Sequence, residues 1–403
     1  MKGETTPTKA AVEALLAPER RKLTQTYARA QRRWRILGTL APLLYLALWY
    51  PTGAAERLHA WVTAQVPWPP AQVALAFLLV GGGMWVVNTV LAIPPQYLAR
   101  RYGLSMQDWE HWLTDQVKAG LVAGVLGLIV LELMYALYVW TGPAWWFWAA
   151  LAVMVILVLL TVVGPILIAP LFFQFTPLED EQLKERLLAL AREAGVPAAD
   201  IYRFDMSRRT RAANAAVVGM GATRRILVAD TLLEKFPPDE VEGVFAHELA
   251  HHVHRDIVWG LLLSAMLTLV CFRLLDGALA LVIRAVDMPP IAPYTLPWLL
   301  FVLLMYSLLV TPLFNLWARS RETLADLFAI ALTGRGTTYA RALARLIDQN
   351  LIDLWPPRWY VILFASHPPP GERLHMALAL GDRDDVSPQS QTPTEGGRYD
   401  DPT

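Results

Sequence analysis

Charged side chains are scarce in this sequence. Only 17% of its 403 residues are Asp, Glu, Lys or Arg, whereas 55% are hydrophobic. Soluble domains carry about 25% charged residues, so this deficit argues against a protein that is soluble throughout. The 35 basic and 35 acidic side chains balance. We therefore expect no nucleic-acid partner and no strongly acidic one.

Two other absences narrow the class of protein. Cys271 is the only cysteine, which excludes an intramolecular disulfide. Residues 1–33 are rich in Arg and contain no long apolar segment, so they lack the layout of a cleaved signal peptide. We expect a basic cytosolic leader, or an ordinary solvated helix, ahead of a first span that stays in the membrane.

Long apolar runs, by contrast, are abundant. A helix needs about 20 apolar residues to cross a bilayer, and six stretches are long enough: 34–55, 73–93, 119–140, 145–172, 257–286 and 295–317. Trp and Tyr gather at their ends, as is typical of the membrane interface. The sequence predicts a mainly α, polytopic transmembrane bundle of six spans, or seven if residues 355–365 form a short further piece.

Basic residues orient this bundle in the lipid bilayer. They occur in the leader, between the second and third spans, and after residues 172 and 317, whereas the alternate loops 52–70, 141–144 and 287–293 are nearly free of Lys and Arg. The positive-inside tendency then places both termini in the cytosol. We expect an integral protein of a bacterial-type inner or plasma membrane.

A cluster of histidines carries the chemistry. Residues 247–251 read H-E-L-A-H, after a helix start at Pro237, Pro238 and Asp239. On a helix His247 and His251 lie one turn apart on the same face, so both imidazoles can bind one tetrahedral zinc. Glu248 points away from that line and suits a general base that takes a proton from water. The alternative is a solvated helix face.

A catalytic zinc needs a third protein ligand and one open position. Glu322 is the best candidate, since it follows the last span on an evident helix. Asp326 lies one turn further on and could accept the far N–H of a ligating histidine. The alternative for both carboxylates is a surface ion pair with Arg319 or Arg321. We expect one Zn²⁺ per chain.

With these helices placed, the sequence resembles the type-I CAAX prenyl protease family, integral-membrane gluzincin zinc metalloproteases with bacterial relatives. The resemblance extends from the first span to about residue 380. It rests on separated motifs, which are 247–251 with Asp256, Arg319 with Glu322 and Ala325-Asp326, Asp230-Thr231-Leu232-Leu233, Asn214-Ala215 with Gly219, and Ser366-His367-Pro368 with Glu372-Arg373-Leu374.

The resemblance implies a role for each matching residue. His247, His251 and Glu322 would bind zinc, with Glu248 as general base and later proton donor. His367 and Arg373 would stabilise the developing oxyanion or hold the substrate, and the Asn214-Ala215 strand would pair with the substrate backbone. From the residues alone, His367 could instead be a structural loop histidine, and Arg373 could pair with Glu372 at the surface.

These expectations combine into a domain organisation. We expect a leader (1–33), a membrane domain with four spans (34–172), a cytosolic α/β segment with the zinc helix (173–256), two further spans (257–317), a third-ligand helix and C-terminal catalytic segment (318–380), and a disordered tail (381–403). In the α/β segment, strand-like runs occur at 201–204, 215–218 and 226–228. The predicted fold is a helical membrane bundle with a cytosolic gluzincin-type α/β zinc metalloprotease domain.

The predicted function is zinc-dependent hydrolysis of peptide bonds at the cytosolic membrane face. The substrate is a peptide or protein, either prenylated or inserted in the membrane. Ala212 and Ala318 depart from the histidine and serine common in eukaryotic members, so quality-control cleavage of unlipidated membrane proteins stays open beside CAAX-type processing. A non-catalytic scaffold or transporter with a structural metal is the second class of hypothesis.

Overall fold

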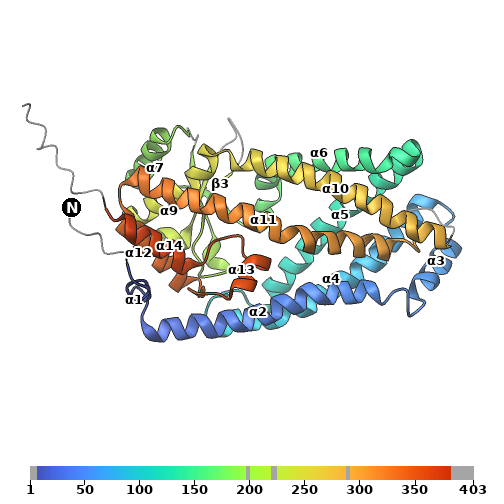
Figure 1. Ribbon diagram of the computed structural model, residues 1–403, viewed down its shortest axis with the longest axis horizontal. Helices are drawn as coiled ribbons and strands as arrows, with labels where there is room; N and C mark the ends of the chain where they lie inside the picture. The colour runs from blue at the N-terminus through green and yellow to red at the C-terminus, as the bar shows by residue number, and fades with distance from the viewer. Residues whose placement is uncertain (1–6, 197–199, 219–224, 287–290, 383–403) are drawn as a thin grey trace, which may run out of the picture.

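The computed structural model describes residues 7–196, 200–218, 225–286 and 291–382. The molecule is elongated, with long helices running along its length and shorter helices gathered around a small sheet at one end (Figure 1). The predicted disordered tail lies outside the described residues from 383 onward. The mainly α, polytopic fold is confirmed.

The elements along the described chain are mostly helices, with the strands within residues 175–229. They are α1 (Lys9–Ala14), α2 (Pro18–Ala47), α3 (Ala54–Gln65), α4 (Pro69–Arg101), α5 (Trp109–Thr141), η1 (Gly142–Ala144), α6 (Trp145–Leu167), η2 (Ala169–Leu171), β1 (Phe175–Pro177), α7 (Glu181–Glu193), β2 (Ile201–Phe204), η3 (Met206–Arg208), β3 (Ala215–Val218), β4 (Arg225–Ala229), α8 (Asp230–Lys235), α9 (Pro238–Val253), α10 (Asp256–Val286), α11 (Leu296–Thr333), α12 (Gly336–Gln349), α13 (Arg358–Phe364) and α14 (Pro370–Leu380).

Four helical stretches of the described chain are long and apolar enough to cross a membrane: Pro69–Arg101, Trp109–Leu171, Asp256–Leu281 and Leu296–Thr333. The second stretch contains two helices, α5 and α6, because the chain turns at Gly142, whose positive φ of 54° suits glycine. Many large apolar side chains on these helices are exposed, as expected for surfaces that face lipid. The chain is an integral membrane protein.

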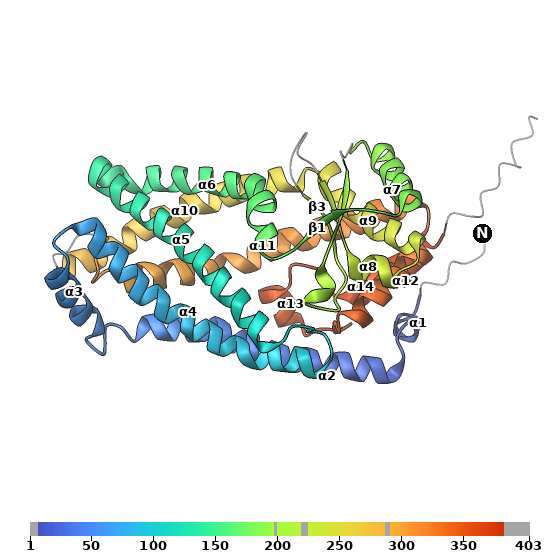
Figure 2. The same cartoon turned by 180° about the vertical axis from the view of Figure 1, so that it is seen from behind.

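The structure differs from the prediction at the first expected span, 34–55, and at the possible further piece, 355–365. The run 34–55 is not one helix, since α2 ends at Ala47 and α3 begins only at Ala54. The N-terminal half of α2 is charged, and α2 is not among the candidate spans of the described chain. It runs beside α4 along one edge of the molecule (Figures 1 and 2). Residues 355–365 do not form a further span, because α13 has only 7 residues and is too short to cross a bilayer.

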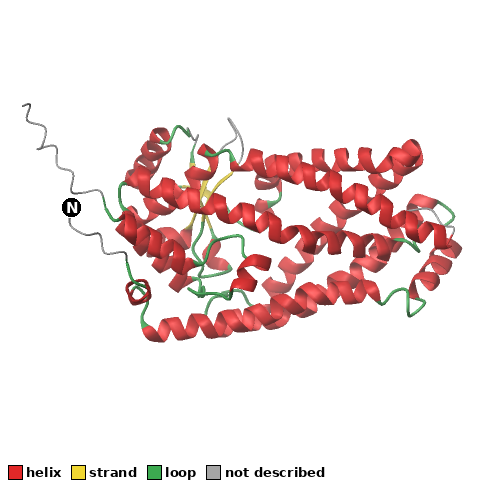
Figure 3. Cartoon of the chain, in the orientation of Figure 1, coloured by secondary structure: helices red, strands yellow, loops and turns green. Residues whose placement is uncertain are grey.

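A four-stranded sheet lies among the shorter helices (Figure 3). Its order is β1-β2-β4-β3, with β2 and β4 parallel and the outer pairs antiparallel. The expected runs at 201–204, 215–218 and 226–228 are strands, whereas the three-residue β1 was not predicted. Ile201, Ile226 and Val228 pack with Leu187 of α7 and Phe245 of α9 in one core. The sheet thus fixes α9 from one side.

The opposite side of α9 packs against α11 and α12. α9 begins with Pro238 at its first turn and buries Val241, Phe245, Ala246 and Leu249, which follow the helical repeat of an apolar face. The chain then turns at Arg255, whose φ is 55°, and continues into the membrane helix α10. The metal motif therefore lies where the membrane helices meet the α/β part.

Candidate metal centre

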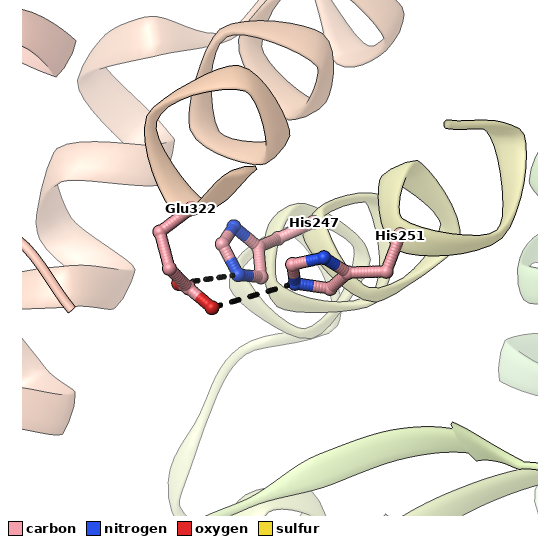
Figure 4. Close-up of side chains that lie close together, drawn as sticks. All are labelled: His247, His251 and Glu322. Carbon is pink, nitrogen blue, oxygen red and sulfur yellow. Dashed lines mark ion pairs between the residues drawn. The ribbon is translucent and has the colours of Figure 1, made fainter. Parts of the chain in front are cut away.

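Two helices bring three potential ligands together. His247 and His251 project from α9, and Glu322 projects toward them from α11 (Figure 4). His247 Nε2 lies 3.3 Å from Glu322 Oε2, and His251 Nε2 lies 3.6 Å from Glu322 Oε1. One ligand atom from each of the three residues lies within 4.8 Å of the others. These are the two histidines that the sequence spacing predicts and the third ligand that a catalytic zinc requires.

His247 is held from behind by a buried carboxylate. Its Nδ1 lies 2.9 Å from Asp326 Oδ1 and 3.1 Å from the Tyr339 hydroxyl. Tyr339 donates to Asp326 Oδ1 at 2.6 Å, and Arg373 donates two hydrogen bonds to the same carboxylate at 2.6 and 2.8 Å. Burial raises the pKa of Tyr339, so its hydroxyl keeps the proton that it donates.

His251 has a support of its own. Its Nδ1 lies 2.8 Å from Asp256 Oδ2, and Arg321 donates to Asp256 Oδ1 at 2.6 Å. The left-handed turn at Arg255 brings Asp256 back beneath the last turn of α9. Arg321 belongs to α11, so this contact also ties the third-ligand helix to the end of the metal helix.

These contacts test whether the residues fit a metal ion. Because the carboxylates of Asp326 and Asp256 accept from the Nδ1 atoms, we assign the proton of each imidazole to Nδ1 and the lone pair to Nε2. Glu322 Oε2 is buried and accepts no hydrogen bond in the described chain. Electron-rich atoms thus converge, at separations close to the roughly 3.4 Å expected between ligands about 2.1 Å from a tetrahedral zinc. The site fits a divalent cation.

The electrostatics of His247 favour a positive charge at the same place. Burial alone would lower the pKa of His247, but the carboxylates of Asp326 and Glu322, which face its two ring nitrogens, outweigh burial and raise the pKa to about 9. A bound divalent cation would take the place of that proton between the imidazole and the carboxylate.

Glu248 lies beside the ligands and is half-buried. Burial raises the pKa of its carboxyl, and the nearby His247 and His251 oppose this rise. Glu248 does not belong to the convergent group of ligand atoms, and it lines an adjacent cavity. A carboxylate with a raised pKa next to a ligand set is suited to accept a proton from water.

The cavity beside the ligands has a volume of about 510 Å³. His247, Glu248, His367 and Arg373 line it, together with Asn214 and Ala215 at the start of β3. β3 is an edge of the sheet, and the Asn214 carbonyl accepts from Ala229 in the inner strand. The alternation of an antiparallel pair then directs the Ala215 peptide groups away from β4, toward the open edge. An extended peptide can pair there.

His367 and Arg373 differ in what they contact. His367 is exposed, with Nε2 3.4 Å from Glu322 Oε1 and Nδ1 2.9 Å from the Ser366 hydroxyl. Arg373 is largely buried, and two of its three guanidinium nitrogens donate to Asp326. The alternative ion pair with Glu372 is therefore wrong, and the salt bridge with Asp326 raises the pKa of Arg373 against the effect of burial.

The alternative surface ion pairs of Glu322 and Asp326 are wrong as well. Arg319 donates to the carbonyls of Val361 and Ala365, and Arg321 donates to Asp256. Arg319 thereby ties α11 to the segment that precedes His367. The two carboxylates face the histidines instead of the solvent.

Two contributors were missed from the sequence. Tyr339 of α12 was not singled out, and Asp256 was noted only as part of a motif. A Cβ on Gly243 would lie 3.3 Å from the Tyr339 ring, and Gly243 is one turn before His247 on α9. A glycine on that helical face was the available signal that another element approaches closely.

The fold and the site define a membrane-embedded metalloprotease. Residues 177–380 match the family described as "Peptidase family M48". Residues 2–174 match the family described as "CAAX prenyl protease N-terminal, five membrane helices". The chain belongs to peptidase family M48. This membership implies a divalent metal, a peptide or protein substrate and a membrane environment, and it confirms the predicted resemblance.

Relatives of this chain occur in bacteria and eukaryotes. An uncharacterized metalloprotease, YhfN of Bacillus subtilis, is 27% identical over 84% of this chain and 80% of that protein. CAAX prenyl protease 1 of Saccharomyces cerevisiae is 26% identical over 87% of this chain and 84% of that protein. The crystal structure of S. mikatae Ste24p shares the fold, with a TM-score of 0.79 at 24% identity over 94% of this chain and 92% of that chain.

Proposed function

We propose that this protein is a zinc endopeptidase in which His247, His251 and Glu322 hold the ion and Glu248 is the general base. The observation that carries the proposal is the convergence of these three ligand atoms beside a cavity that Glu248 also lines. Zinc is favoured over harder cations because two imidazoles and one carboxylate form an open three-ligand set of the kind that catalytic zinc uses.

The residues of this chain divide the reaction between them. Zinc would act as a Lewis acid that polarises the scissile carbonyl and makes water more acidic. Glu248 takes the proton from the attacking water and passes it to the leaving amine. His367 donates a hydrogen bond to the developing oxyanion, and Arg373 acts mainly by holding Asp326 against His247. The Ala215 edge holds the substrate backbone.

We place cleavage at the cytosolic membrane face of a bacterial-type inner or plasma membrane. α9 leads directly into the membrane helix α10, and Glu322 lies on the continuation of the apolar part of α11, so the site is close to lipid. The basic segments fall on the same side as the α/β part, in agreement with the positive-inside tendency. Cysteine-accessibility labelling of a Cys271→Ser background checks this orientation, because a cysteine at Gln391 should react only from the cytosolic side.

We further propose CAAX-like processing of a prenylated substrate, which the relatives named CAAX prenyl protease support. Quality-control cleavage of unlipidated membrane proteins is the second candidate, supported by the departures at Ala212 and Ala318. Matched farnesylated and unmodified peptides separate the two. Processing predicts strong dependence of kcat/KM on the lipid, whereas quality control predicts similar values for both peptides.

The Glu248→Gln variant tests the proposed mechanism. The amide keeps the shape of the side chain but cannot accept the proton, so we expect kcat to fall about 10²- to 10⁴-fold while zinc content stays unchanged. Peptide cleavage and elemental analysis of the same purified sample give both values. Retained cleavage in the variant would overturn the role of Glu248, whereas a wild type that cleaves no peptide would favour the non-catalytic scaffold or transporter.

A further inference from the structure

One wall of the active-site cavity comes from α2, at the other end of the chain. Ala28, Gln31, Arg32 and Arg35 line the cavity, and their spacing places them on one face of a helix. Tyr360 and Phe364 of α13 line it beside the two arginines. The cavity therefore extends from the metal ligands to a pair of arginines on the N-terminal helix.

The two arginines of this wall differ in charge balance. Arg32 donates to Asp353 at 2.9 Å, and both side chains are largely buried, at 11% and 9% exposure. Arg35 donates to the Tyr360 hydroxyl at 2.9 Å, and its guanidinium lies 5.9 Å from the Tyr360 and Phe364 ring centres. Within the described chain, no carboxylate forms a salt bridge with Arg35. Arg35 is thus an exposed cation at the cavity that no carboxylate of residues 7–196, 200–218, 225–286 and 291–382 neutralises.

The remaining charges of the cavity do not compensate for it. Asp353 forms a salt bridge with Arg32, and Asp326 forms one with Arg373. Glu248 lies beside the metal ligands. Tyr360 accepts one N–H and leaves the rest of the planar guanidinium fork available. Such a fork matches a carboxylate in a bidentate arrangement.

We propose that Arg35 is a specificity-determining residue that binds a carboxylate of the substrate while the scissile bond lies at the metal centre. The inference rests on the proposed peptidase function and deepens it. The volume of about 510 Å³ suits a short peptide segment, so the anion belongs within a few residues of the cleaved bond. It is either the terminal carboxylate or an acidic side chain, and both present the same group to Arg35.

A peptide series distinguishes these two sources. One substrate that wild type cleaves is prepared with a free C-terminus and as its amide, each with Asp or Asn at a position near the scissile bond. Enzyme is reconstituted in neutral phosphatidylcholine vesicles, and KM and kcat are measured for wild type, Arg35→Gln and Arg35→Lys. Arg33→Gln is the matched control, because Arg33 is exposed on the same helix but does not line the cavity.

For wild type we expect KM to be about tenfold lower for the peptide that carries the recognised carboxylate, with kcat little changed. Arg35→Gln should abolish this preference, Arg35→Lys should keep part of it, and Arg33→Gln should leave it intact. The amidated Asn peptide should be cleaved equally by all four proteins, which shows that Arg35→Gln is folded and active.

Two results would overturn the proposal. One is a wild-type KM that ignores both carboxylates. The other is an effect of Arg35→Gln that is equal for all peptides and grows when phosphatidylglycerol is added, which would assign Arg35 to a lipid headgroup. Failure of wild type to cleave any peptide would instead count against the peptidase function itself.

Discussion

The two histidines of the metal centre are held by carboxylates that differ in how deeply they are buried. On the inner side, His247 is 10% exposed and is backed by Asp326, which is fully buried and receives hydrogen bonds from Tyr339 and Arg373. On the outer side, His251 is 24% exposed and is backed by Asp256, which is 9% exposed and bonded to Arg321. Each histidine thus has a carboxylate, but only the inner one is sealed from water.

This difference in burial predicts which side of the centre contributes more to metal affinity and folding stability. The inner support is a buried network in which Asp326 faces His247 and accepts from Tyr339 and Arg373. Such networks fix geometry because breaking them leaves buried groups unsatisfied. The outer support lies at the junction of α9 and α10, where water can replace a lost contact. We therefore expect the inner side to dominate both metal affinity and folding stability.

The largest effect that tests this comparison is expected from Asp326→Asn. The amide cannot balance Arg373 or accept from His247 and Tyr339 as the carboxylate does. We expect zinc affinity to fall about 100-fold and the free energy of unfolding to drop by about 3–5 kcal/mol, as when one partner of a buried ion pair is removed. Chelator competition and thermal unfolding in detergent measure the two quantities.

Asp256→Asn should have a smaller effect. Arg321 is 21% exposed, so water can solvate its guanidinium after the charge of Asp256 is lost. We expect zinc affinity to fall about tenfold, with a change in unfolding free energy well below that of Asp326→Asn. If Asp256→Asn were equal to or worse than Asp326→Asn in both assays, the distinction between the inner and outer supports would be wrong.

The smallest effect is expected from Tyr339→Phe. This variant removes one hydroxyl and leaves Asp326 with the two hydrogen bonds from Arg373. We expect the free energy of unfolding to fall by about 1 kcal/mol and zinc affinity to fall only a few-fold. Tyr97→Phe, at an exposed tyrosine of α4, serves as the control and should change neither quantity. A loss as large as that of Asp326→Asn would make Tyr339 the main support.

The sequence predicted those parts of the molecule that depend on local periodicity. His247 and His251 share a helical face because they are four residues apart on α9. The apolar runs of α4, α5, α6, α10 and α11 are long enough to predict that these helices cross a bilayer. Glu322 followed from the requirement for a third ligand. The strand runs of the sheet were visible as short apolar segments, whereas β1 has only 3 residues and no periodicity to detect.

Most of the parts that were missed depend on contacts between distant segments. Nothing local to Tyr339 shows that α12 packs its ring against Gly243. The assignment of Arg373 to the substrate overlooked Asp326, which is 47 residues away along the chain. The first expected span was drawn too long, because hydropathy does not register the turn at 48–53 in which Gly53 adopts a φ of 66°.

The zinc content of purified Glu322→Gln tests the central claim most directly, with Glu248→Gln as the matched variant. Both changes replace a half-buried glutamate by its amide, but only Glu322 belongs to the convergent ligand set. We predict about one zinc per chain in wild type and in Glu248→Gln, and a ratio near zero in Glu322→Gln after dialysis. A full complement of zinc in Glu322→Gln, or none in wild type, would contradict the account.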